Sequence, residues 1–302
     1  MNFKLKYFSL LFFVSAITFS QSKLNSFLKP SDTLNKSRQK ALFISEASLV
    51  GVTLIGLNQL WYADYDKSKF HTINDNDEWM QMDKFGHLFS SYQLGRIGAD
   101  ALNWSGVSKK KQLIYGSTLG FGFLTTVEIF DGFSKEWGFS WGDVLANGLG
   151  TTLYVGQELL WEEQRISIKF SFHQTKYALQ SPDKLGKSFQ EQLLKDYNGQ
   201  TYWLSANLHS FFKESKFPKW INIAFGYGAS GMLNGSKDID NQLLTNNDRY
   251  HQYYLSFDVN LKNIKTDSHF LKTILSVFNS IKVPFPTLEL SNKRCVFHLL
   301  YY

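Results

Sequence analysis

The chain has 302 residues, 17% of them aromatic, and a formal net charge of +6. Its lysines and arginines are spread along the sequence, so nucleic-acid binding, which needs a clustered basic stripe, is not expected. A single cysteine, Cys295, excludes an internal disulfide, and burial must therefore hold the fold together. Mild basicity and many Trp and Tyr side chains fit a membrane surface, and an aromatic-rich core explains them equally well.

Residues 1–20 have the pattern of an export signal. MNFKLKY carries two lysines, FSLLFFVSAITF is an apolar stretch, and small residues precede Ser20. We expect a signal peptide that is cleaved near Ser20, without lipid modification because no cysteine lies there. The expected location is the bacterial cell envelope, facing the periplasm and associated with a membrane, with inner and outer membrane both open.

Residues 21–163 are expected to form a helical domain. The apolar runs 41–62 and 111–130 are about as long as a bilayer core is thick, roughly 30 Å at 1.5 Å per residue. Two more polar segments, 84–103 and 141–161, contain recurrent small residues that favour close helix packing. The sequence therefore predicts a four-helix bundle that is either embedded in a membrane or docked on it.

Residues 164–302 are expected to form a β-rich domain. Stretches such as RISIKFSFHQTKY alternate apolar and polar residues, which indicates antiparallel strands with one buried face. The strands are expected at 165–177, 201–211, 219–233, 251–261 and 294–302, with short amphipathic helices at 188–197 and 268–281. Pro284 and Pro286 mark an extended break. The predicted fold class is α+β, and an outer-membrane β-barrel, which needs roughly eight strands, is the alternative.

Two of the predicted helices carry polar pairs near one end. Asp83 and His87 are four residues apart, as are Asp143 and Asn147, and each pair shares a helix face. Asp83 could simply cap its helix, and Asp143 fits a capping box with Ser140. These roles and a functional role both remain open.

Glu128 and Asp131 end the third apolar run. Acidic groups at a helix C-terminus oppose the helix dipole, so a cation is expected to compensate them. The candidates are Lys84, Arg96, Lys135 and a bound cation. Glu46, within the first apolar run, is expected to join this polar group or to pair with Arg96.

If the helix ends converge, they form a site for general acid–base chemistry on an envelope lipid or glycan headgroup. His87 or Glu128 would be the base, and Asp83 would orient His87. The expected substrate-binding residues are Lys84 for an anionic group, Asp131, Asp143 and Asn147. No cofactor is expected; a divalent metal held by Asp and His is a minor alternative, because the spacing matches no zinc motif.

A non-enzymatic function is an alternative interpretation of the same polar residues. The same polar residues could form a buried network that fixes the register of the helices in an envelope scaffold. Whether the chain is an enzyme therefore stays open. The acidic stretch NDNDEW (74–79) lacks the glycine and final glutamate of a calcium loop, so it is interpreted as a solvated loop.

The ordered motifs resemble a known family. Asp83-Lys84-x-x-His87 is followed by Glu128 and then by Gly138-Phe-Ser-x-x-Asp143-x-x-Ala-Asn147-x-x-Gly150. This pattern is similar to the YfiM-like family of predicted periplasmic lipoproteins, of unknown function, and more distantly to VanZ-like membrane proteins. The resemblance covers about residues 80–155, and it implies an envelope protein with a polar site on these side chains.

Overall fold

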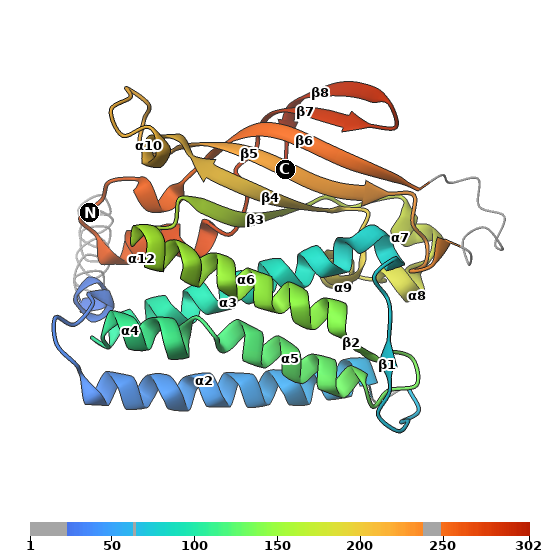
Figure 1. Ribbon diagram of the computed structural model, residues 1–302, viewed down its shortest axis with the longest axis horizontal. Helices are drawn as coiled ribbons and strands as arrows, with labels where there is room; N and C mark the ends of the chain where they lie inside the picture. Colours follow the sequence, from blue (N-terminus) through green and yellow to red (C-terminus); the bar gives the residue numbers. More distant parts are fainter. Residues whose placement is uncertain (1–22, 63–64, 238–248) are drawn as a thin grey trace, which may run out of the picture.

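The computed structural model describes residues 23–62, 65–237 and 249–302 (Figure 1). The expected signal peptide, residues 1–20, lies outside the described residues. The fold is α+β, as predicted: a group of long helices packs against an antiparallel sheet of six strands.

The long helices are α2 (Lys36–Leu57), α3 (Met82–Trp104), α5 (Leu119–Asp131) and α6 (Trp141–Trp161). The third predicted helix is broken: α4 (Lys109–Lys111) continues into a π-helical turn, Gln112–Gly116, before α5 begins. At this turn Gly116 meets α3 so closely that an added Cβ would lie 2.6 Å from the backbone nitrogen of Ala99. The break thus occurs where the chain crosses α3.

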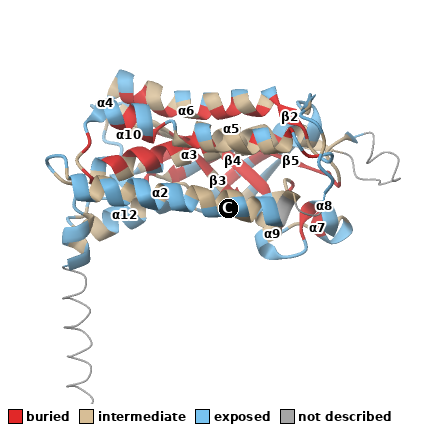
Figure 2. Cartoon of the chain, turned by 90° about the horizontal axis from the view of Figure 1, so that it is seen from below, coloured by how far each residue is buried: buried red, intermediate tan, exposed pale blue. Residues whose placement is uncertain are grey.

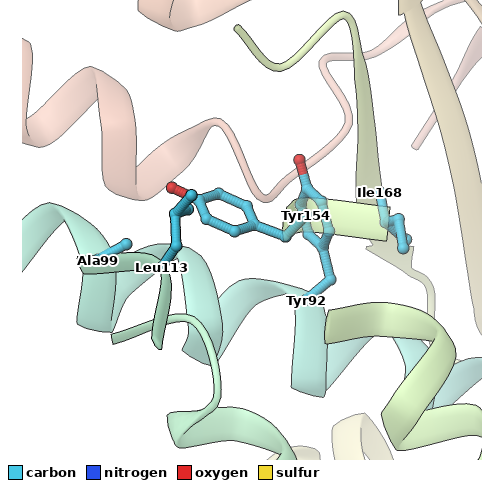
Figure 3. Close-up of a cluster of buried hydrophobic side chains, with 5 residues drawn as sticks. All are labelled: Tyr92, Ala99, Leu113, Tyr154 and Ile168. Atoms are coloured by element: carbon cyan, nitrogen blue, oxygen red, sulfur yellow. The ribbon is translucent and has the colours of Figure 1, made fainter. Parts of the chain in front are cut away.

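Helices α3, α5 and α6 pack closely, whereas α2 lies along the outside (Figures 1 and 2). The rings of Tyr92 of α3 and Tyr154 of α6 form a T-shaped contact, with centroids 5.8 Å apart, within a buried cluster that also holds Ile168 of the sheet (Figure 3). In contrast, no residue in the apolar window of α2 is buried. By length and composition, two described segments could cross a membrane, Lys36–Leu57 and Lys109–Asp131, and they overlap the two long apolar runs of the sequence.

The strands follow one another in chain order, each antiparallel to the next. They are β3 (Ile166–Phe172), β4 (Gln200–Asn207), β5 (Ile221–Ser230), β6 (Tyr250–Val259), β7 (Phe285–Ser291) and β8 (Arg294–Tyr301). Strand β7 was not expected, because its prolines suggested a break. Pro286 is tolerated because it sits at a register irregularity between Phe285 and Thr287, and irregular positions are where sheets accept proline.

Shorter elements complete the chain. A parallel pair joins β1 (Thr72–Ile73) to β2 (Phe139–Ser140). The short helices are 23–28, α7 (Tyr177–Gln180), α8 (Pro182–Leu185), α9 (Phe189–Lys195), α10 (Leu208–Phe211) and α12 (His269–Phe278), with π-helical Asn58–Tyr62 and 3-10 turns at Glu78–Gln81 and Leu261–Asn263. Of these, α9 and α12 match the two amphipathic helices predicted from the sequence.

The face of the sheet that carries Lys169 is buried, and it holds polar side chains together with the aromatic cluster of Trp203, Tyr254 and Tyr301. Lys169 of β3 and Asp258 of β6 form an ion pair of 2.7 Å, and both side chains are fully buried. Tyr301 of β8 reaches Thr201 of β4 at 3.1 Å. Because side chains from non-adjacent strands meet, the sheet must curl around this polar face, which leaves its apolar face on the outside.

The free edge of β3 is covered by other parts of the chain. The backbone of Phe170 donates to Ser280 and accepts from Lys282, so the segment before β7 adds a short bridge to this edge. The side chain of Gln157, on α6, bonds both the nitrogen and the carbonyl of Ile166. These contacts satisfy backbone groups that an edge strand would otherwise expose.

Candidate functional site

The first turn of α3 presents the site's first side chains. Trp79, Met80 and Gln81 precede it with positive φ angles of 47°, 50° and 66°, a conformation rare for residues other than glycine. The helix then starts without a side-chain cap, so Asp83 lies inside the first turn and is not the N-cap. Its Oδ1 atom accepts a hydrogen bond from the hydroxyl of Tyr197 at 2.7 Å.

The start of α6 supplies the second part. Ser140 is the N-cap, and its Oγ accepts from the backbone nitrogen of Asp143 at 3.2 Å, as the capping-box prediction requires. In a capping box, the backbone nitrogen of the N-cap residue donates to the side chain three residues later. Here the backbone nitrogen of Ser140 donates instead to Glu128 Oε2 at 3.2 Å. The carboxylate of Asp143 is therefore free of the capping role and turns toward α3.

His87 lies at the centre of the cluster. Its Nε2 atom is 3.5 Å from Glu128 Oε1 and 3.8 Å from one oxygen each of Asp83 and Asp143. Its Nδ1 atom is 3.2 Å from Oδ1 of Asn147, which is fully buried. One imidazole thus joins the ends of α3, α5 and α6, and the convergence predicted from the sequence is present in the structure.

Lys84 is held by three carboxylates. Its Nζ atom lies 2.8 Å from Asp75, 2.8 Å from Asp143 and 3.2 Å from Asp83. Asp75 also accepts a hydrogen bond from Ser140 Oγ at 2.7 Å. This side chain belongs to the stretch that we had interpreted as a solvated loop; that interpretation is wrong for Asp75, because β1 pairs with β2 and draws the loop over the start of α6.

Asp131 lies one turn beyond Glu128 at the end of α5 and follows Phe130, which lines a cavity of about 520 Å³. The hydroxyl of Tyr62 donates to Asp131 Oδ1 at 2.6 Å. The cavity is lined by Leu54, Ile55, Asn58, Tyr62, Tyr65, Asp66, Lys67, Ser68, Phe130, Phe133 and Ser134. Its walls are mostly apolar and aromatic, and through Tyr62 it adjoins the polar cluster.

Burial and charge shift the proton affinities at the cluster. Burial raises the pKa of Asp143 to about 7, and the nearby Asp83 adds to this, against the opposing effect of His87 and Lys84. Burial disfavours a charged His87, but the carboxylates of Asp83, Asp143 and Glu128 outweigh it and raise the pKa of His87 above its ordinary value. The cluster can therefore hold and release protons near neutral pH.

Two cationic side chains that the sequence suggested as partners of the acidic groups pair elsewhere, and two tyrosines that it did not suggest bind the carboxylates. Arg96 pairs with Asp100 at 3.4 Å rather than with Glu46 or the cluster. Lys135 pairs with Asp66 on the surface. Tyr62 and Tyr197 were missed, because a tyrosine at the edge of an aromatic-rich segment carries no signal that separates it from core residues.

Three side chains of the cluster carry atoms that could act as ligands of a divalent metal. One ligand atom each from Asp83, His87 and Asp143 lie within 4.8 Å of one another. The ammonium group of Lys84 already lies against Asp143 and supplies positive charge there. The cluster thus carries its own cation, and its chemistry can be described without a metal.

Comparisons with known proteins agree with the motif analysis. A family model described as a predicted periplasmic lipoprotein (DUF2279) matches residues 73–157, a range that runs from before Asp75 to beyond Asn147. The comparisons do not show the more distant similarity of this chain to VanZ-like membrane proteins. Searches of the curated proteins and of the solved structures found no match. The family description supports a cell-envelope, periplasm-facing location. Residues 73–157 therefore match the model of the family of predicted periplasmic lipoproteins that the motifs of this chain resemble.

Proposed function

We propose that the protein binds an envelope lipid or glycan headgroup at the cluster, with His87 or Glu128 as the group that exchanges a proton with it. The observation that carries this proposal is the position of His87, whose Nε2 faces three carboxylates while Nδ1 is fixed by Asn147. A ring held in this way is oriented for general acid–base chemistry.

The cluster is partly open, as a binding site must be. The side chains of Asp83 and His87 are 25% and 16% exposed, whereas that of Glu128 is only 3% exposed. The apolar cavity beside Tyr62 gives room for a hydrocarbon chain. Among envelope compounds, this combination favours a lipid, with its headgroup on the cluster and its chain in the cavity.

The charges indicate which headgroup fits. The ammonium group of Lys84 is already surrounded by the carboxyl groups of Asp75, Asp83 and Asp143, which compensate its charge before any anionic headgroup binds. Hydroxyl or amine groups, which donate hydrogen bonds, would therefore meet Asp83 and Glu128 more favourably than a phosphate would. In this proposal Lys84 organises the carboxylates, while Asp131, Asp143 and Asn147 line the bound headgroup.

The test is to purify the full chain from its membrane fraction and identify co-purifying lipids by mass spectrometry. His87→Ala removes a charge-assisted contact, so retained lipid should fall about tenfold or more; the variant should stay folded, with a loss of about 1–3 kcal/mol from the broken contact with Asn147. His209→Ala is a matched control, because this half-buried histidine lies on α10 at the other end of the molecule. Wild-type protein that carries no lipid would contradict the proposal.

A structural scaffold is the second candidate. It is favoured by the way Lys84 and Ser140 tie a loop, α3 and α6 together through Asp75 and Asp143. If this is the cluster's only role, His87→Ala should lower the melting temperature strongly, and the wild-type protein should retain no lipid. The same experiment therefore separates the two candidates.

A further inference from the structure

The polarity of the curled sheet is inverted relative to that of a water-soluble domain. Its concave side buries a charged pair, Lys169 and Asp258, together with serines, asparagines and the aromatic rings of Trp203, Tyr254 and Tyr301. Its convex side exposes a row of large apolar residues paired across five strands. The row consists of Leu204, Phe225, Leu255, Leu288 and Phe297, which are 48%, 54%, 40%, 45% and 61% exposed.

The opposite side of the molecule is apolar as well. Along α2, from Ala41 to Leu57, Glu46 is the single charged residue, and Leu49 and Val52 are 68% and 67% exposed. The exposed residues of α6 are uncharged: Trp141, Leu145, Leu149, Thr152, Leu159 and Leu160. A protein partner on one face would leave the other uncovered, whereas a lipid bilayer surrounds both.

The dimensions match a bilayer. The long helices and the central strands run roughly along the long axis of the molecule (Figure 1). Helix α2 has 22 residues, and strands β5 and β6 have 10 each. At about 1.5 Å and 3.3 Å per residue these lengths all give about 33 Å, close to the hydrocarbon thickness.

One end of this apolar belt has the composition of a membrane interface. The segment FFKESKFPKW, residues 211–220, joins α10 to β5 and exposes Phe212, Phe217 and Trp220 beside three lysines. Aromatic rings prefer the headgroup level, and the lysines complement anionic lipid headgroups. The His87 cluster lies at the other end of the same helices.

We propose that the convex face of the sheet and the exposed sides of α2 and α6 form a lipid-facing belt. In this arrangement residues 211–220 lie at one bilayer interface, and the His87 cluster lies beyond the hydrocarbon at the other. The proposal does not depend on the headgroup bound by the cluster.

Site-directed spin labelling of the full chain tests this directly. Cys295→Ser gives a background in which Phe225→Cys places a label at mid-sheet, Leu49→Cys on α2, and Glu214→Cys in the interface segment. In vesicles of phosphatidylethanolamine and phosphatidylglycerol, labels at 225 and 49 should collide several-fold more with oxygen than with a water-soluble nickel chelate. The label at 214 should show the reverse preference.

The native cysteine provides a measurement without substitution. Cys295 lies on the convex face, because it pairs with Leu290, and it sits close to the β7–β8 turn. A label there should favour oxygen, less strongly than the label at 225. Preference for nickel at 225 and 49 would overturn the proposal, and so would shielding from both reagents, because a protein partner or a second copy would then cover the belt.

Discussion

His87 and Asn147 link α3 to α6 through one contact of 3.2 Å between Nδ1 and Oδ1. The bond leaves Nε2 to face the carboxylates, with Glu128 nearest at 3.5 Å. A single buried amide thus sets the orientation of the ring. The contact would fix both the geometry of the cluster and the direction in which His87 can exchange a proton.

Asn147→Leu should reduce the free energy of unfolding by about 1–3 kcal/mol, because His87 would lose its partner in a buried site. Chemical denaturation followed by tryptophan fluorescence measures this change. Thr152→Leu is the matched control, because it lies on the exposed side of the same helix and should change stability by less than about 0.5 kcal/mol. Equal effects of the two substitutions would argue against an orienting role for Asn147.

Stability should fall as the pH rises from about 4, near the ordinary pKa of Asp143, to above 7. Asp143 has its pKa raised to about 7, so the stability that comes from its neutral form is lost as the pH rises through that value. The pKa of His87 is also raised, and the contribution of its charged form, complete below its ordinary value of 6.5, is lost above it.

Melting temperatures across this range test the pH prediction. Asp143→Asn should flatten the lower part of the profile and His87→Asn the upper part, since each removes one titrating group. Wild-type slopes retained in both variants would show that other groups control the pH dependence.

Because α5 packs closely against α3, Gly120 should not tolerate a larger side chain, whereas Gly122 should. A Cβ at Gly120 would lie 2.3 Å from the carbonyl oxygen of Ser91, whereas one at Gly122 would meet nothing within 4 Å. Gly120→Ala should destabilise by about 1–3 kcal/mol. Gly122→Ala should stabilise by about 0.5–1 kcal/mol through helix propensity. A lower melting temperature for Gly120→Ala and a higher one for Gly122→Ala would confirm the packing. Changes in the same direction would contradict it.

Removing one partner of the buried pair inside the sheet should be costly. Lys169→Met leaves the Asp258 carboxylate buried without its cation and should cost about 3–5 kcal/mol. The double variant Lys169→Met, Asp258→Leu should recover much of this loss. The exposed pair of Lys187 and Asp183 is the control, because solvent screens this pair and Lys187→Met should leave the free energy of unfolding nearly unchanged. A full additive loss in the double variant would show that the pair is not the source of the effect.

Helix periodicity and local spacing were enough to predict much of the site. Residues four apart, such as Asp83 and His87, must share a helix face, so the polar ends of the helices were recognisable before their convergence was known. Asp75 was not predictable in this way, because its position depends on the pairing of β1 with β2, which is separated by more than sixty residues in the chain.

The sheet shows a different limit of sequence reasoning. Alternation reveals two faces but not which of them is buried, and in β3 both Lys169 and Ile168 are buried. The direction in which the sheet curls depends on contacts between non-adjacent strands, such as that of Lys169 with Asp258. Strand β7 was hidden because proline signals a break, although one proline at an irregular position leaves the ladder intact.

The capping of β3 has a consequence for the order of folding. Its edge groups bond to Gln157 and to Gln93, whose Nε2 donates to the carbonyl of Ile168 at 2.6 Å. Both glutamines precede β3 in the chain, so during synthesis the helices emerge before the strand whose edge they cover. An unprotected strand edge is a template for aggregation. A circular permutant that delivered the strands first would therefore lose this protection while keeping every native contact available.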